Sequence, residues 1–279
     1  MIALLGTASL AATAATAPGA DQTDPGDAGG LEPPLPPKET PTPTREPSKT
    51  PGHRGDDPTP TPTPTTPSVP VTTSCESVVH IGDSTSIGLM DKNYLPKKGD
   101  RINAQYRKVG AKDVQTDISG ARSIVETWHG FPNAQTAVRE RIDKGYNGCW
   151  VVAMGTNDTA NQAAGSNVDS DQRIDLLMQA IGDHPTMWLT VRTLRTSGPY
   201  AEKQMQKWDD ALVRACPRYP QMRVYDWAAQ VKDSWFIDDK IHFTTPGYRE
   251  RARRTARALA TAFPSNGVSP TECLVAPPD

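Results

Sequence analysis

Four residues of the types needed for nucleophilic acyl transfer stand in short polar segments of this sequence: Ser84, Asn157, Asp239 and His242. A serine hydroxyl attacks an ester only when a base takes its proton, and a carboxylate beside an imidazole holds the ring in the tautomer that can do so. Asp239 lies three residues before His242, so a single loop can pair them. The side-chain amide of Asn157 can donate to the oxyanion that forms on attack. These residue types predict serine-based acyl transfer.

Each segment also has a structural interpretation. Gly-Asp-Ser at 82–84 is common in turns and helix caps, because Asp and Ser side chains bond to nearby backbone groups. Asn-Asp at 157–158 can form an Asx turn, and a lone histidine such as His242 is often structural or simply exposed. The occurrence of all the required groups in one chain favours the catalytic interpretation.

Short apolar runs alternate with amphipathic helical patterns, which predicts an α/β domain with a mainly parallel sheet. The expected strands cover 77–82, 113–118, 149–155, 187–192 and 222–227. The expected helices cover 133–144, 170–182, 200–215 and 247–262. Ser84 and Asn157 each follow an expected strand, and open α/β sheets bind ligands at the carboxyl ends of their strands.

The beginning of the chain differs in composition from the rest. Residues 1–17 form an apolar run that ends in small Ala-x-Ala patterns and predict a signal peptide; an uncleaved N-terminal anchor is the alternative, because no positive charge precedes the run. Residues 18–73 are rich in Pro and Thr and poor in large apolar residues, so we expect a disordered linker. Residues 74–279 then form one folded domain of roughly 200 residues.

Charge and cysteine content limit the classes of ligand that the chain is expected to bind. A net charge of −2 gives no indication of nucleic-acid binding. The Arg-rich stretch 249–254 is best interpreted as the solvent-exposed face of a helix. The four cysteines have no metal-ligand spacing, so we expect neither a metal site nor another cofactor. Export would favour two disulfides over free thiols.

The polar segments also resemble the sequence blocks of the SGNH (GDSL-type) hydrolases. HisIleGlyAspSerThr at 80–85 looks like block I, AspIleSerGlyAlaArgSer at 117–123 like block II, GlyThrAsnAsp at 155–158 like block III, and AspLysIleHis at 239–242 like block V. The resemblance runs through almost the whole expected domain in the block order of the family. It implies a three-layer, flavodoxin-like α/β/α sandwich with a five-stranded parallel sheet.

The resemblance also implies roles for individual residues. Ser84 is the implied nucleophile, His242 its base and Asp239 the partner that orients the ring. The implied oxyanion hole consists of the Ser84 and Gly120 backbone N–H groups and the Asn157 side chain. Two of these assignments have an alternative. Gly110 is an alternative to Gly120, and Asp238 stands beside Asp239, although only Asp239 has the three-residue offset of the family.

The disulfide pairing follows from the family fold as well. Cys75 precedes Ser84 by nine residues and Cys149 precedes Asn157 by eight, in strands that this fold makes neighbours. The implied pairs are Cys75 with Cys149 and Cys216 with Cys273.

The expected activity is that of a secreted or cell-envelope serine esterase acting on small acyl esters of a carbohydrate or glycolipid carrier. An O-acyltransferase of cell-envelope glycans is one alternative, because residues 187–242 resemble the extracellular SGNH domains of such enzymes; a catalytically silent glycan-binding module is another. We expect a monomer that reaches the bacterial cell wall through its linker. Arg192 and Arg195, near the end of the fourth expected strand, are candidates for binding a substrate carboxylate, with a surface salt bridge as the alternative.

Overall fold

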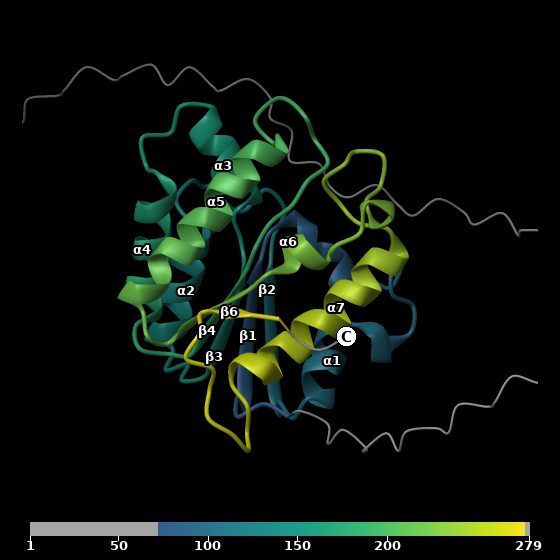
Figure 1. Ribbon diagram of the computed structural model, residues 1–279, viewed down its shortest axis with the longest axis vertical. Coiled ribbons are helices and arrows are strands. Elements are labelled where there is room, and N and C mark those ends of the chain that lie inside the picture. Colours follow the sequence, from purple (N-terminus) through teal and green to yellow (C-terminus); the bar gives the residue numbers. More distant parts are fainter. Residues whose placement is uncertain (1–71, 277–279) are drawn as a thin grey trace, which may run out of the picture.

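A six-stranded parallel sheet organises residues 72–276, the part of the chain that the computed structural model describes (Figure 1). In spatial order the strands are β2 (Asp113–Ile118), β1 (Ser77–Gly82), β3 (Cys149–Ala153), β4 (Thr186–Leu189), β5 (Met222–Tyr225) and β6 (Leu274–Val275). The α/β class and the parallel sheet predicted from the sequence are confirmed. The number of strands was wrong, because β6 has only two residues and too little pattern to be recognised.

Helices cover both faces of the sheet and complete the expected three layers. The helices are α1 (Ile102–Lys108), α2 (Ala134–Asp143), α3 (Thr156–Ala163), α4 (Ser170–Ile181), α5 (Glu202–Ala215), α6 (Trp227–Gln230) and α7 (Thr245–Ala262). Helices α2, α4 and α5 lie together on one face, and α1 and α7 lie on the other (Figure 1). Two hydrophobic clusters fill the two interfaces, with Val78 in one and Val79 in the other, as alternation along a strand requires.

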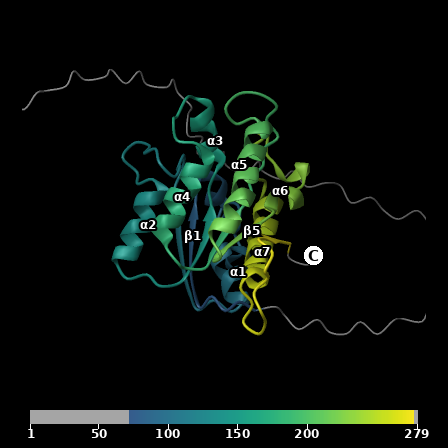
Figure 2. The same ribbon diagram turned by 60° about the vertical axis from the view of Figure 1, so that its left-hand side comes forward.

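The parallel direction of β1 to β5 brings their carboxyl ends to one edge of the sheet. Helix α3 begins directly after β3 and stands at the upper end of the molecule in Figure 2. The loop before α7 ends at Thr244, whose side chain accepts from the Gly247 N–H and caps that helix. The candidate residues therefore stand in short segments whose positions are set by the strands and helices on either side.

Two disulfides tie the chain away from this edge. Cys75–Cys149 joins the amino ends of β1 and β3, and Cys216–Cys273 links the end of α5 to the segment before β6. These are the same pairs that the family resemblance implied. The second disulfide, together with the hydrogen bond from the Val224 N–H to the Cys273 carbonyl, holds β6 against β5.

The signal peptide expected at 1–17 and nearly all of the linker expected at 18–73 lie outside the described residues. Thr73, at the end of the expected linker, is buried; its backbone N–H donates to the Val109 carbonyl at 2.7 Å. Within residues 72–276, no helix combines the length and the hydropathy needed to cross a membrane.

Candidate active site

Ser84 stands at the turn that follows β1. Asp83 caps a short 3-10 helix over Ser84–Leu89, and its Oδ1 accepts from the Thr85 N–H at 2.9 Å and from the Thr85 hydroxyl at 2.7 Å. A Cβ on Gly82 would lie 2.7 Å from the Ser86 side chain, so only glycine fits where β1 turns. The turn holds Ser84 at the carboxyl end of the sheet with 7% of its surface exposed.

A row of two hydrogen bonds joins Ser84 to the loop before α7. His242 Nε2 lies 2.9 Å from the Ser84 hydroxyl, and His242 Nδ1 lies 2.7 Å from Asp239 Oδ2. The other carboxylate oxygen, Asp239 Oδ1, accepts from the backbone N–H groups of Ile241 at 2.8 Å and His242 at 2.9 Å. Asp239 therefore both orients the ring and folds the loop that carries it, and it is Asp239 rather than Asp238 that contacts His242.

The carboxylate of Asp239 is stabilised as an anion. Burial raises the pKa of Asp239. Hydrogen bonds from the His242 ring and from the His242 and Ile241 backbone lower it by a larger amount, so the pKa lies below the ordinary value of 3.8. An ionised Asp239 favours the tautomer with a proton on Nδ1, which leaves Nε2 free to accept the Ser84 proton. This geometry is suited to general-base activation of a serine.

Asn157 lies at the start of α3, on the opposite side of the Ser84 turn from β2. Its Nδ2 donates to the Arg122 carbonyl at 3.0 Å, and its Oδ1 accepts from the Tyr200 hydroxyl at 3.2 Å. A side-chain amide has two N–H groups, so one remains for a ligand. The chain turns into α3 at Gly155, which has a φ of 134°, and a Cβ there would lie 2.3 Å from the Trp208 ring.

The two candidate glycines lie at opposite ends of the sheet. Gly120 follows β2, and the N–H of the preceding Ser119 donates to the Gly82 carbonyl at 3.1 Å, which places this segment beside the Ser84 turn. Gly110 precedes β2 and lies near Thr73, at the amino ends of the strands. Position alone therefore favours Gly120 as the backbone donor.

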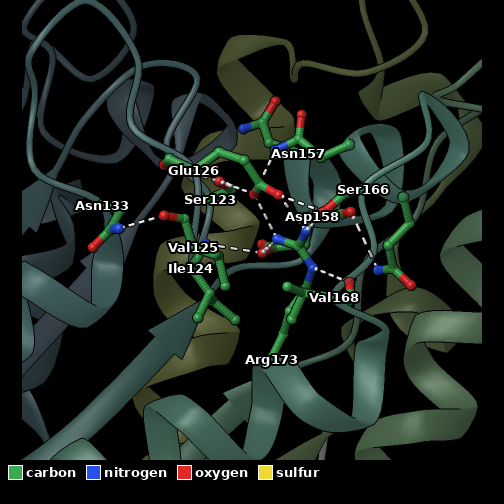
Figure 3. A network of polar contacts seen from close by, with 12 residues as sticks. Ser123, Ile124, Val125, Glu126, Asn133, Asn157, Asp158, Ser166, Val168 and Arg173 are labelled. Carbon is green, nitrogen blue, oxygen red and sulfur yellow. Dashed lines mark hydrogen bonds and ion pairs between the residues drawn. The ribbon is translucent and has the colours of Figure 1, made fainter. Parts of the chain in front are cut away.

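A buried network around Arg173 connects the segments of Gly120 and Asn157 (Figure 3). The fully buried Arg173 guanidinium donates to both carboxylate oxygens of Glu126, at 2.6 and 2.5 Å, and to Asp158 Oδ1 at 3.0 Å. Asp158 Oδ1 also accepts from the Ile124 N–H at 2.8 Å. One side chain on α4 thus fixes both the loop after β2 and the first turn of α3. Sequence reasoning missed Arg173, since nothing distinguishes it from other helical arginines.

Glu126 gives the network an expected pH dependence. Burial raises the pKa of Glu126, but hydrogen bonds and charge from Arg173 lower it by a larger amount. The net effect is a pKa that falls from 4.5 to about 2. A carboxyl with a depressed pKa stabilises the fold above its unfolded pKa, and this contribution is lost as the pH falls through the folded value. We expect the stability advantage of the wild type over Glu126→Gln to shrink between pH 4.5 and 2 in urea unfolding. Glu140→Gln, at an exposed carboxylate of α2, controls for the lost charge; an advantage that stays constant with pH would contradict the assignment.

His80 is the other histidine near Ser84, but its surroundings make it unsuited to act as a base. The ring is fully buried behind the turn, and its Nδ1 lies 2.8 Å from the Tyr106 hydroxyl. Burial, with a smaller effect of the nearby Arg251 cation, lowers the pKa of His80 to about 3. A ring that resists protonation cannot take the proton of a nucleophile, so His242 is the better candidate.

The remaining candidates for ligand binding are the two arginines after β4. Arg192 donates to Asp233 at 2.6 Å and to the Val231 carbonyl at 3.0 Å, so its guanidinium is held by a neighbouring loop, as in the salt-bridge alternative. Arg195 is exposed and lines a groove. Within the described part of the chain, no group of three or more His, Cys, Asp or Glu side chains is placed to hold a metal ion.

Solved structures with a similar fold include carbohydrate esterases. A carbohydrate acetylesterase family member from Sinorhizobium meliloti is 14% identical, with a TM-score of 0.50 over 66% of this chain and 99% of that chain. A carbohydrate esterase family 2 enzyme from Corynascus thermopiles (Myceliophthora fergusii) is 18% identical, with a TM-score of 0.50 over 71% of this chain and 68% of that chain. The catalytic domain of peptidoglycan O-acetyltransferase A from Streptococcus pneumoniae is 15% identical, with a TM-score of 0.49 over 67% and 92% of the two chains.

These likenesses are of structure and not of sequence. No protein-family model matches the chain, and no curated protein does. The chain shares its α/β fold with these two carbohydrate esterases, at 14% and 18% identity. That class of fold agrees with the block resemblance in the sequence.

Proposed function

We propose that this chain is an extracytoplasmic serine esterase that cleaves small acyl esters, of the acetyl type, on a carbohydrate or glycolipid carrier. The observation that carries the proposal is the hydrogen-bonded row of Ser84, His242 and Asp239 at the carboxyl edge of a parallel sheet. A binding module would have no need of a base aligned on a serine hydroxyl and oriented by a carboxylate.

The mechanism has two chemical steps. His242 Nε2 takes the Ser84 proton as the hydroxyl oxygen attacks the ester carbonyl, and the negative charge moves to the carbonyl oxygen. The Ser84 and Gly120 backbone N–H groups and the Asn157 amide stabilise that oxyanion. The protonated His242 then gives its proton to the departing alcohol, which leaves an acyl-serine. Water, deprotonated by His242, releases the acid and restores the enzyme.

The proposed carrier and location rest on separate observations. The two solved structures with a TM-score of 0.50 are described as carbohydrate esterases, which supports an acyl ester on a sugar. Two disulfides support a location outside the reducing cytoplasm. The apolar run at 1–17 and the Pro/Thr-rich stretch at 18–73 agree with export and with a tether that reaches into a cell-envelope polymer.

Labelling with a fluorophosphonate tests the proposal directly. We expect one label per chain, on Ser84, and loss of the label in His242→Ala. A panel of acetylated sugars, assayed with and without glycan acceptors, then measures hydrolysis and transfer in the same reaction. Free acid as the main product supports the esterase, whereas acylated acceptor as the main product would make the chain an O-acyltransferase. No label, combined with retention on wall glycan, would replace both by a glycan-binding module.

A further inference from the structure

A groove beyond the carboxyl end of β4 lies next to the candidate active site. It has a volume of about 770 Å³ and is bounded by the loop after β4, the start of α5 and the loop that carries Asp239. Its charged lining side chains are Arg192, Arg195, Glu202, Lys203, Asp233 and Lys240. Cations therefore outnumber carboxylates in the lining.

Two hydrogen-bonded connections join the groove wall to the site. The Leu194 N–H donates to the Lys240 carbonyl at 2.8 Å, in the loop between Asp239 and His242. The Thr193 hydroxyl donates to the Tyr200 carbonyl at 2.7 Å, and the Tyr200 hydroxyl donates to Asn157 Oδ1. The loop after β4 thus contacts the histidine loop at one point and the candidate oxyanion donor at another. A carrier whose ester reaches Ser84 can extend along this loop.

Both carboxylates of the groove already have partners. Asp233 accepts from Arg192 at 2.6 Å, and Arg192 is further held by the Val231 carbonyl. Glu202 Oε2 accepts from the Thr193 N–H at 2.8 Å, which fixes the start of α5 against the loop. Arg192 is therefore part of the groove wall and is balanced by Asp233, whereas Glu202 keeps its negative charge, so the four cations of the lining exceed its two carboxylates by two charges.

Of the four cations that line the groove, three form no salt bridge with a carboxylate of residues 72–276: Arg195, Lys203 and Lys240. They come from the three different segments that bound the groove, and all three are exposed. The Arg195 carbonyl accepts from the Glu202 N–H at 2.8 Å, so its backbone is held to the start of α5. Unpaired cations that converge from separate segments favour a ligand with negative charge.

We propose that this groove binds an anionic group, a carboxylate or a phosphate, on the carrier of the acyl ester. The inference rests on the proposed esterase function and adds the charge of its substrate. The Arg195 guanidinium can bind either oxyanion through two parallel N–H donors, and the two lysines add charge without a fixed geometry. The anionic group selects the carrier, while the reaction itself takes place at Ser84.

Matched acetyl esters test the inference. The substrates are the O-acetylated forms of methyl glucoside, methyl glucuronide and methyl glucoside phosphate, which differ in charge but present the same ester. We expect kcat/KM of the wild type to be about tenfold or more higher for an anionic carrier than for the neutral one, through KM. The ratio of the two anionic carriers distinguishes a carboxylate from a phosphate ligand. Added salt should lower the preference.

Variants locate the preference on the molecule. In Arg195→Gln/Lys203→Gln the ratio of anionic to neutral kcat/KM should fall towards 1. Lys203→Gln alone should lower the ratio part of the way. Its matched control is Lys207→Gln, which removes an exposed cation from the same helix but outside the groove; the ratio of this control should equal that of the wild type. Equal loss in both variants would mean that only the general field of the protein matters and would overturn the inference.

Binding measurements separate this inference from the proposed function. Calorimetric titration of Ser84→Ala with methyl glucuronide, methyl glucoside phosphate and methyl glucoside needs no turnover. An anionic glycoside bound more tightly than the neutral one, with the difference lost in Arg195→Gln/Lys203→Gln, supports the groove even if no ester is cleaved. Cleavage of all three esters at equal kcat/KM, with equal binding of the glycosides, would leave the esterase standing and overturn the anionic site.

Discussion

Ser84→Ala should lower kcat for p-nitrophenyl acetate by about 10⁴-fold or more, and His242→Ala should do nearly the same. The reason is that the two side chains share one hydrogen bond of 2.9 Å and act as a unit, so either substitution removes the activated nucleophile. The double variant should therefore be no slower than the slower single variant. This lack of additivity distinguishes a nucleophile and its base from two residues that merely support the fold.

Ser265→Ala is the control for the loss of a hydroxyl. Ser265 is exposed and lies near Thr72, at the amino ends of the strands and far along the sheet from Ser84. Its activity should match the wild type, and its free energy of unfolding should fall by no more than the roughly 0.5–1.5 kcal/mol of the exposed hydrogen bond between the Ser265 and Thr72 hydroxyls. A Ser84→Ala protein that unfolds like the wild type yet keeps more than about 1% of the activity would contradict the assignment of the nucleophile.

The sequence predicted the elements with strong periodicity and missed those without it. The helices expected at 133–144 and 170–182 are present as α2 and α4, which are long and carry one apolar face. Helix α1 (Ile102–Lys108) is a short run whose buried face includes Gln105, so its pattern gives no clear apolar stripe. Helix α3 was not among the expected helices, because its first residues are polar and also suit an Asx turn; it starts after Gly155, which packs closely on Trp208.

Strand ends depend on contacts that lie far away in the sequence. The strand expected at 187–192 ends at Leu189, since the chain then leaves the sheet to meet other elements. The Thr190 N–H still donates to the Tyr225 carbonyl of β5 at 3.0 Å, but the Val191 N–H donates to the Asp209 side chain on α5 at 2.8 Å. Neither partner can be recognised from the apolar run itself, so the local pattern overestimated the length of the strand.

The candidate site was accessible to sequence reasoning because its residues stand in short, ordered segments. Asp239 and His242 are three residues apart, and one loop suffices to join them. The contacts that hold the segment of Asn157 in place could not be predicted in this way. Arg173 lies 15 residues after Asp158 and 47 after Glu126, and only the folded chain shows that these side chains meet.

Arg173→Met should lower the free energy of unfolding by about 3–5 kcal/mol, the second large effect that we expect. The substitution leaves Asp158 fully buried without its cation and removes the main partner of Glu126. Burial already raises the pKa of Asp158 to about 6 against the opposing effect of Arg173, so this carboxylate is costly to keep charged even in the intact network. Urea unfolding at pH 7 measures the loss.

Arg218→Met provides the matched control. Arg218 also pairs with a carboxylate, at 2.7 Å from Asp175, but 41% of its side chain is exposed. An exposed ion pair contributes between 0 and about 1 kcal/mol, so this variant should unfold close to the wild type. Equal losses in Arg173→Met and Arg218→Met would show that burial of the network does not determine its contribution.

Asp158→Asn tests the same network if Arg173→Met does not fold. The amide oxygen can still accept from the Ile124 N–H, and Arg173 keeps Glu126 as its partner, so the loss of stability should be smaller. Combined with Arg173→Met, Asp158→Asn removes the unpaired buried charge and should recover about 0.5–3 kcal/mol of the lost stability.

Because the network also fixes the first turn of α3, the Arg173 variants should show a larger fall in kcat than change in KM for a small ester. Unchanged kcat in a destabilised variant would restrict Arg173 to the fold and leave Asn157 positioned by Arg122 and Tyr200 alone.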